Sequence, residues 1–205
     1  MAGRREESAR ESRRRLLEAA TELVARAGPR AASVQAVADR AGISRGSVAW
    51  HFGSKDGLIV EVIEQAFGAA EEEYRRRLPA SGPLSFGLLV DAHLAVMDAP
   101  CGRVFATVLP EVLRDAGPLR DAYVRGYEQT RRVWVGYLER IAAAAPGLPD
   151  AKSLASIVFG SGIGVHTLHH LDGLVDREGA FAALKQLFAL ATARAGAEPG
   201  GAAGA

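Results

Sequence analysis

The sequence predicts an all-α protein of about nine helices, in which an N-terminal three-helix unit precedes a larger helical bundle. Apolar residues recur every three or four positions through most of the chain, and no segment alternates as a strand would. Glycine-proline pairs at 28–29, 82–83 and 117–118 divide the chain into helix-length segments. Hydrophobic residues make up 48% of the sequence, which is enough for a sizeable core.

Four helices are expected in the N-terminal part of the chain. An apolar stripe at helical spacing predicts the first at 12–26. Serine favours helix starts because its side chain accepts a hydrogen bond from a free backbone N–H group. We therefore expect Ser33, Ser44 and Ser54 to cap the next three helices. The fourth helix is long and is expected to end before Pro79.

Five more helices are expected beyond that proline. Glycines and prolines place them at 84–98, 103–114, 118–145, 150–171 and 178–195. The two ends of the chain, 1–10 and 196–205, contain little that a core could bury. Both ends are therefore expected to be disordered.

The segment 33–55, SVQAVADRAGISRGSVAWHFGSK, is the most informative part of the sequence. Two short helices flank Gly42, and glycine permits the backbone conformation of a tight turn. The apolar positions of this helix-turn-helix are Val34, Val37, Ile43, Val48 and Phe52. Phe52 is interpreted as a core residue, whereas Trp50 fits a core position and a DNA contact equally well. Arg45 offers the paired donors that suit a guanine edge in the major groove.

Together with the first amphipathic helix, the stretch SVQAVADRAGISRGSVAWHFGSKDGL resembles the DNA-binding head of TetR/AcrR-type transcriptional regulators. The resemblance covers about residues 13–67 and implies binding to double-stranded DNA. The DNA-contacting positions that it implies are Ser33, Gln35, Arg45, Gly46, Ser47, Trp50, His51 and, for phosphate, Lys55. The family usually has Tyr or another aromatic residue at the position of Ala49, so one backbone contact is missing. The arginines that are candidates to compensate are Arg4, Arg5, Arg10 and Arg13.

Charge is distributed unevenly along a chain whose net charge is only +1. Through Lys55 there are 11 basic residues against 6 acidic ones, whereas the remainder holds 14 against 18. A basic N-terminal part is the asymmetry expected of a nucleic-acid-binding head. The single cysteine, Cys101, and the charged first residues predict a cytoplasmic protein. The uncharged stretch 153–171 contains polar residues, so we expect a buried helix and no membrane partner.

A homodimer is expected because specific binding by a helix-turn-helix normally requires two half-sites. In the family that the chain resembles, the last helices of two subunits form the interface. The expected interface residues are Leu154, Ile157, Val158, Gly160, Gly164, Val165, Leu168, Phe181, Leu184 and Phe188. Each glycine inside a helix costs about 1 kcal/mol relative to alanine. The two glycines indicate either close helix approach or a local break in the helix.

A small-molecule effector is expected to bind among the middle helices, because pockets are mostly apolar with a few polar groups. The candidate lining residues are Phe86, His93, Met97, Phe105, Tyr123, Tyr127 and Trp134, each of which is also compatible with an ordinary core position. His166, His169 and His170 share one helix, but we expect interface or surface histidines there rather than a metal site.

These observations predict a sequence-specific transcriptional regulator, and in particular a repressor released from an inverted-repeat operator by a small, largely apolar ligand. The sequence is also compatible with activation. No phosphate-binding glycine loop, CxxC, HExxH or GxSxG motif occurs, so neither enzymatic activity nor a cofactor is expected. The alternative is a ligand- or metal-binding helical dimer with an impaired head, which Ala49 favours. The expected segments are a basic arm (1–10), a DNA-binding domain (11–56), a ligand-sensing and dimerisation domain (57–195) and a tail (196–205).

Overall fold

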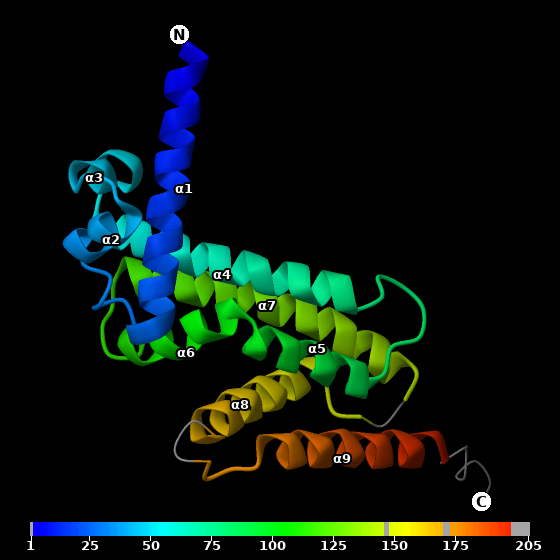
Figure 1. Cartoon of the computed structure of the whole chain (residues 1–205). Helices are drawn as coiled ribbons and strands as arrows, with labels where there is room; N and C mark the ends of the chain where they lie inside the picture. The colour runs from blue at the N-terminus through cyan, green and yellow to red at the C-terminus, as the bar shows by residue number, and fades with distance from the viewer. Residues whose placement is uncertain (1, 146–147, 170–172, 198–205) are drawn as a thin grey trace, which may run out of the picture. The chain divides into compact units, whose positions relative to one another are not determined.

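The computed structural model describes residues 2–145, 148–169 and 173–197, and across those ranges it consists of nine α-helices without a strand (Figure 1). The helices are α1 (Ala2–Ala27), α2 (Val34–Ala41), α3 (Gly46–Phe52), α4 (Lys55–Arg77), α5 (Phe86–Asp98), α6 (Pro100–Val112), α7 (Pro118–Ala143), α8 (Ala151–His169) and α9 (Arg177–Ala197). The all-α prediction is confirmed. Among the described residues, no helix is long and apolar enough to cross a membrane.

The helices group into two compact units. The first unit contains the residues up to Glu72 together with Val96–Glu128, and the second contains Glu73–Ala95 and the described residues from Gln129 onward. In the first unit, α1 packs against α2, α3 and α6, with α2 and α3 together on one side of it (Figure 1). In the second unit, α8 packs against α9. The functional division after residue 56 remains a prediction.

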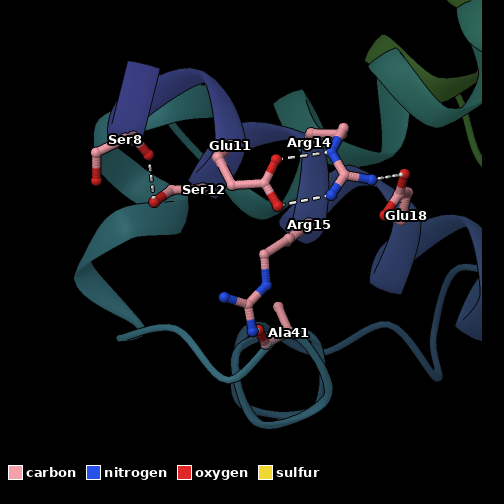
Figure 2. A network of polar contacts seen from close by, with 7 residues as sticks. All are labelled: Ser8, Glu11, Ser12, Arg14, Arg15, Glu18 and Ala41. Carbon is pink, nitrogen blue, oxygen red and sulfur yellow. Dashed lines mark hydrogen bonds and ion pairs between the residues drawn. The ribbon is translucent and has the colours of Figure 1, made fainter. Parts of the chain in front are cut away.

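Helix α1 begins at Ala2, so the prediction of disorder over 1–10 is wrong for the described residues. Adding residues to an existing helix avoids the cost of nucleation, and Arg, Glu and Ala are strong helix formers. Side-chain pairs support the exposed part of the helix, as Figure 2 shows. Arg14 binds Glu11 and Glu18, each at 2.6 Å, one turn before and one turn after it. Ser12 Oγ donates to the Ser8 carbonyl at 2.9 Å.

The head formed by α1, α2 and α3 has a small, fully enclosed core. Leu16 and Val24 of α1, Val37 of α2 and Val48 of α3 are all buried. The Arg15 guanidinium points to the end of α2, where it donates to the Ala41 carbonyl at 2.5 Å (Figure 2). This bond satisfies a carbonyl that the helix itself leaves free at its C-terminus.

Two of the three expected serine caps are confirmed. Ser33 Oγ accepts from the Ala36 N–H at 3.1 Å, and Ser54 Oγ accepts from the Gly57 N–H at 3.0 Å. The expected cap by Ser44 is wrong, because its Oγ instead lies 3.0 Å from Ser47 Oγ. Backbone bonds replace it: the N–H groups of Ser47 and Val48 bond to carbonyls three residues earlier, so the helix start needs no side chain.

Several later helix boundaries differ from the expected ones by a few residues. Helix α6 starts at Pro100 rather than at 103, because a proline in the first turn lacks only an N–H that would have no helical partner. Helix α9 continues to Ala197, which shortens the expected tail; 198–205 lie outside the described residues. The expected end of the preceding helix, at 171, also lies outside them.

The turn between α2 and α3 depends on Gly42, whose φ of 63° is left-handed and whose N–H caps α2. Replacing Gly42 with Ala adds a Cβ in this conformation, 3.1 Å from Arg15 Nη2. We expect Gly42→Ala to lower the free energy of unfolding by about 1–2 kcal/mol, measured by chemical denaturation. Gly46→Ala is the matched control, because a Cβ there meets no atom within 4 Å. Equal stability of Gly42→Ala and the parent would contradict this account of the turn.

Candidate functional site

The predicted DNA-contacting residues lie on the last turn before α2, on α2, on α3 and at the start of α4, and we call this set the head surface. Its members are Ser33, Gln35, Arg45, Gly46, Ser47, Trp50, His51 and Lys55. The first four and Trp50 are exposed, whereas Ser47, His51 and Lys55 are half-buried. Val48 faces the core from α3, so the remaining faces of that short helix are available to a partner.

Trp50 is the most informative residue of the head surface. Its side chain is 71% exposed, so it is not a core residue. The Trp50 ring meets His51 edge-on, with 4.3 Å between the ring centroids. An exposed indole beside an imidazole offers N–H donors and flat apolar area to a binding partner.

Phe52 and Arg13 contact each other within the head. Phe52 is half-buried rather than fully enclosed, and the Arg13 guanidinium lies 5.2 Å from its ring centroid. Arg13 also forms an ion pair with Glu61 of α4. Arg13 is thus engaged within the head, and its compensating contact with DNA remains a prediction.

The surroundings of His51 on the head surface favour the neutral form of its side chain. Partial burial, and then the nearby positive charge of Arg13, lower the His51 pKa below its ordinary value. A neutral imidazole can donate one hydrogen bond and accept another. Ala49 lies exposed beside it, at the position where the family usually has an aromatic residue.

Helix α6 is attached to the C-terminal end of α1 within the first unit. Thr107 Oγ1 donates to the Val24 carbonyl at 2.8 Å, and Glu111 lies 3.8 Å from Arg30. Gly28 has a φ of 80°, and a Cβ there would lie 3.2 Å from the Glu111 carboxylate. These contacts were not predicted, because Thr107 and Val24 are 83 residues apart and nothing in either local sequence identifies the other.

The seven candidate pocket residues are divided between the two compact units. Phe86, His93 and Trp134 belong to the second unit, whereas the other four belong to the first. In the first unit, Phe105 and Tyr123 pack around Phe67, with ring centroids 4.6 and 5.3 Å from it. Two further candidates of that unit are Met97, which is buried, and Tyr127, which is half-buried.

In the second unit, His93 and Trp134 lie in a buried aromatic cluster. The Trp134 ring centroid is 5.2 Å from that of His93 and 4.8 Å from that of Phe159. Tyr74 and His93 are linked by a hydrogen bond of 2.8 Å between Tyr74 Oη and His93 Nδ1. Burial, and then nearby His166, lower the His93 pKa to about 4. Tyr74 and Phe159 carry no signal in the sequence that separates them from other apolar positions.

Phe86, the third candidate in this unit, lies at a separate place. Its ring stacks on Phe188 of α9, with 3.4 Å between centroids. Beside this stack is a groove of about 430 Å³ between the start of α5, the end of α7 and α9. The stacked pair thus joins Phe86, a predicted pocket residue, to Phe188, a predicted interface residue.

The predicted interface residues divide by exposure along α8 and α9. The buried ones are Leu154, Val158 and Phe181, and the half-buried ones are Gly164, Val165, Leu184 and Phe188. The exposed ones are Ile157, Gly160 and Leu168. Leu187 and Leu190, which were not among the predicted residues, add to the exposed apolar area of α9 at 64% and 56% exposure.

The alternative of a broken helix at the glycines is wrong, because α8 runs without interruption from Ala151 to His169. A Cβ at Gly160 or Gly164 would meet no atom within 4 Å, so neither glycine is required by packing within this chain. Gly162, between them, does face the interior: a Cβ there would lie 2.7 Å from His93 Nε2. Close helix approach at the outer two glycines remains a prediction.

The three histidines of the α8 region do not share one environment. His166 is buried, and His169 Nδ1 lies 3.0 Å from the Val175 carbonyl. His170 lies outside the described residues. Within the part of the chain that the structure describes, no three potential ligands gather as a metal site would require.

Comparison with known proteins bears directly on the head. Residues 16–62 match the family model described as bacterial regulatory proteins, tetR family. The match to this family therefore covers the helix-turn-helix head. It is 35% identical over 88 residues to the HTH-type transcriptional regulator AcrR of Shigella flexneri, and this match covers 42% of the chain and 40% of the relative. It is 32% identical over 132 residues to the HTH-type transcriptional repressor KstR2 of Rhodococcus jostii, which covers 62% of the chain and 63% of that repressor.

The chain thus spans less than two thirds of these two relatives. Over the whole fold it is similar to FadR from Bacillus subtilis, a transcriptional regulator whose structure is known in complex with stearoyl-CoA. That similarity has a TM-score of 0.68 at 17% identity and covers 86% of this chain and 97% of FadR. At this identity the likeness shows a shared fold.

The buried His93 makes stability depend on pH. Its pKa is about 4 when folded, against an ordinary value of 6.5, so the folded protein binds fewer protons there than the unfolded chain. The stabilisation is complete above pH 6.5 and is lost as pH falls through 4, a difference of about 3 kcal/mol. Denaturant unfolding between pH 4 and 7 measures it. His93→Phe should remove this dependence while His169→Gln retains it; identical profiles for His93→Phe and the parent would refute the assignment.

Proposed function

We propose that this protein is a sequence-specific transcriptional regulator, and in particular a repressor that binds an inverted-repeat operator as a homodimer. The observation that carries the proposal is the outward face of α3. Trp50 is exposed there and Val48 is buried, which leaves a short helix presented to a partner on a rigid head. A helix held in this way suits the major groove, which admits one α-helix.

Different residues of the head surface are proposed to recognise bases and to bind phosphates. Arg45 is exposed just before α3 and carries the fork of donors that suits O6 and N7 of guanine. Lys55 is the first residue of α4, where its charge adds to the positive end of the helix dipole at a phosphate. The surplus of basic residues through Lys55 strengthens binding to any DNA sequence and makes it sensitive to salt.

We propose that the protein dimerises through α8 and α9, so that the dimer has two DNA-binding heads for the two half-sites of the operator. Ile157 and Leu187 are 57% and 64% exposed, and a second copy would remove this apolar area from water. The open space around Gly160 and Gly164 allows the backbone of another helix to approach closely.

A small, largely apolar ligand is proposed to release the operator. It acts by binding one of two head spacings more tightly than the other, to the extent of its differential affinity. Helix α4 begins at the head and is the continuous segment through which such a change would pass. FadR, which shares the fold, was solved with an acyl ligand, stearoyl-CoA, and this supports a ligand-binding role for the helical body.

The proposal is tested by selecting genomic fragments with the purified protein and titrating the best fragment over a salt series. An inverted-repeat site with steep salt dependence supports the dimeric regulator. Weak binding that is indifferent to sequence would instead support the second candidate, a ligand- or metal-binding dimer with an impaired head. The exposed Ala49, in place of an aromatic phosphate contact, is the observation that favours this candidate.

Two substitutions on the head surface should differ in effect. Arg45→Ala should weaken binding to the selected site by about 1–3 kcal/mol and relax the preference for one base pair. Lys55→Ala should weaken binding to all sequences alike and lower the salt slope by about one. Fluorescence anisotropy with matched and scrambled duplexes measures both. Parent-like binding by both variants would show that the recognition surface lies elsewhere.

The same assay tests the departure at position 49. Ala49→Tyr restores an aromatic hydroxyl at an exposed position of α3. We expect tighter binding to specific and scrambled duplexes together, because phosphate contacts carry no sequence information. Ala36→Tyr, on α2, is a control for the general effect of an added tyrosine.

The proposed interface is tested by oligomeric state. Ile157→Glu introduces a charge into the exposed apolar area of α8 and should convert the dimer to a monomer in sedimentation at micromolar concentration. Leu113→Glu is the matched control, because Leu113 is 71% exposed and belongs to neither α8 nor α9. A dimer that tolerates Ile157→Glu would place the interface on another surface.

A further inference from the structure

Two of the buried ring nitrogens in the second unit, one on Trp134 and one on His93, have no hydrogen-bond partner within the described chain. Trp134 is fully buried and its Nε1–H has no acceptor among the described residues. His93 is 3% exposed, and its Nε2 likewise has no partner within the described chain. Each such group costs about 1–3 kcal/mol when left unsatisfied, so native proteins rarely leave them so. Two of them on neighbouring rings indicate that something else occupies the site.

The chemistry of the missing group follows from the donors. Tryptophan Nε1 is only ever a donor, so Trp134 requires an acceptor. Tyr74 Oη already lies 2.8 Å from His93 Nδ1. When the Tyr74 hydroxyl donates to Nδ1, the His93 hydrogen resides on Nε2, and that atom also requires an acceptor. One oxygen with two lone pairs can serve both nitrogens.

The charge of the missing group follows from the state of His93. Burial keeps this imidazole neutral at neutral pH, so it supplies no positive charge to balance an anion. The surrounding rings of Tyr74, Trp134 and Phe159 provide apolar walls. A buried carboxylate without a counter-ion is costly, whereas a carbonyl or ether oxygen is not. The site therefore selects a neutral acceptor.

Gly162 brings the backbone of α8 close to His93 Nε2. This glycine lies inside α8, where glycine costs about 1 kcal/mol relative to alanine. A Cβ at this position would lie 2.7 Å from Nε2, which is closer than real Cβ contacts. Any larger residue would cover the nitrogen that the proposed ligand has to reach.

We propose that the cluster of Tyr74, His93, Trp134, Phe159 and Gly162 binds a neutral small molecule through a carbonyl or ether oxygen, which accepts from Trp134 Nε1–H and His93 Nε2–H. The inference rests on the ligand-binding part of the proposed function and names the class of effector. It differs from a purely apolar pocket, because the polar contact is what distinguishes one apolar compound from another.

The test uses the indole N–H of Trp134 as a direct reporter. Trp134 and Trp50 are the two tryptophans of the chain, so Trp50→Phe leaves a single indole resonance in a ¹⁵N-tryptophan-labelled sample. The probes are acetone, cyclohexanone and acetophenone, together with α-methylstyrene, in which a methylene group replaces the acetophenone oxygen. The three ketones cover a range of sizes. We expect at least one ketone to move the Trp134 indole proton downfield saturably and to raise the melting temperature.

Two controls separate binding from general solvent effects. α-Methylstyrene should leave the indole proton near its original position, because it offers no acceptor. Gly162→Ala, checked for cooperative unfolding, should weaken ketone binding at least tenfold because its Cβ takes the space at His93 Nε2. Equal shifts from acetophenone and α-methylstyrene would overturn the proposal.

If no ketone moves the indole proton and the proton shows a cross-peak to water, the site holds a buried water only. This result would also overturn the proposal. The experiment contains no DNA, so its result is independent of operator binding. Binding of a ketone without binding of an operator would support this site and contradict the proposed regulator. Binding of an operator without binding of any ketone would support the regulator and contradict this inference.

Discussion

The apolar stripe of α1 is the element on which the rest of the first unit depends. Leu16, Ala20 and Val24 are fully buried, and α2, α3 and α6 all pack against the same helix. Polar contacts at both ends then set the geometry: Arg15 binds the Ala41 carbonyl, and Thr107 binds the Val24 carbonyl. Burial of apolar side chains supplies most of the stability, whereas these directional hydrogen bonds determine the position of each neighbouring helix along α1. The outward face of α3 is exposed because its inward face, at Val48, belongs to this core.

The same rule, that buried polar groups need partners, separates the head from the cluster in the second unit. In the head, the serine caps and backbone turns satisfy N–H groups locally. Around Trp134 and His93, two ring nitrogens have no partner in the described chain. A structural core has no use for such groups, and a binding site does. We therefore regard the head surface as the DNA-binding site and this cluster as the place where an effector is recognised.

Local chemistry made much of the fold predictable. The nine helices, the glycine turn at Gly42 and the caps by Ser33 and Ser54 each depend on residues within a few positions of one another. The errors have a common origin. Ser44 was expected to cap a helix whose start is satisfied by backbone bonds, and the charged N-terminus was expected to be disordered although it extends α1. In both places the local structure depended on the backbone of the adjoining segment rather than on the residue type at that position.

The sequence by itself determined which residues form helices, where the recognition segment lies and that one end of the chain is basic, because periodicity, caps and charge are local properties. Only the tertiary structure decided that Trp50 faces solvent, that Arg13 contacts Glu61 and Phe52, and that the seven candidate pocket residues are divided between the two compact units. It also placed Gly162 against His93, 69 positions earlier in the chain. Such contacts join residues that are far apart in sequence. The helical period of a sequence indicates which face of a helix is apolar, but it does not indicate which residues pack against that face.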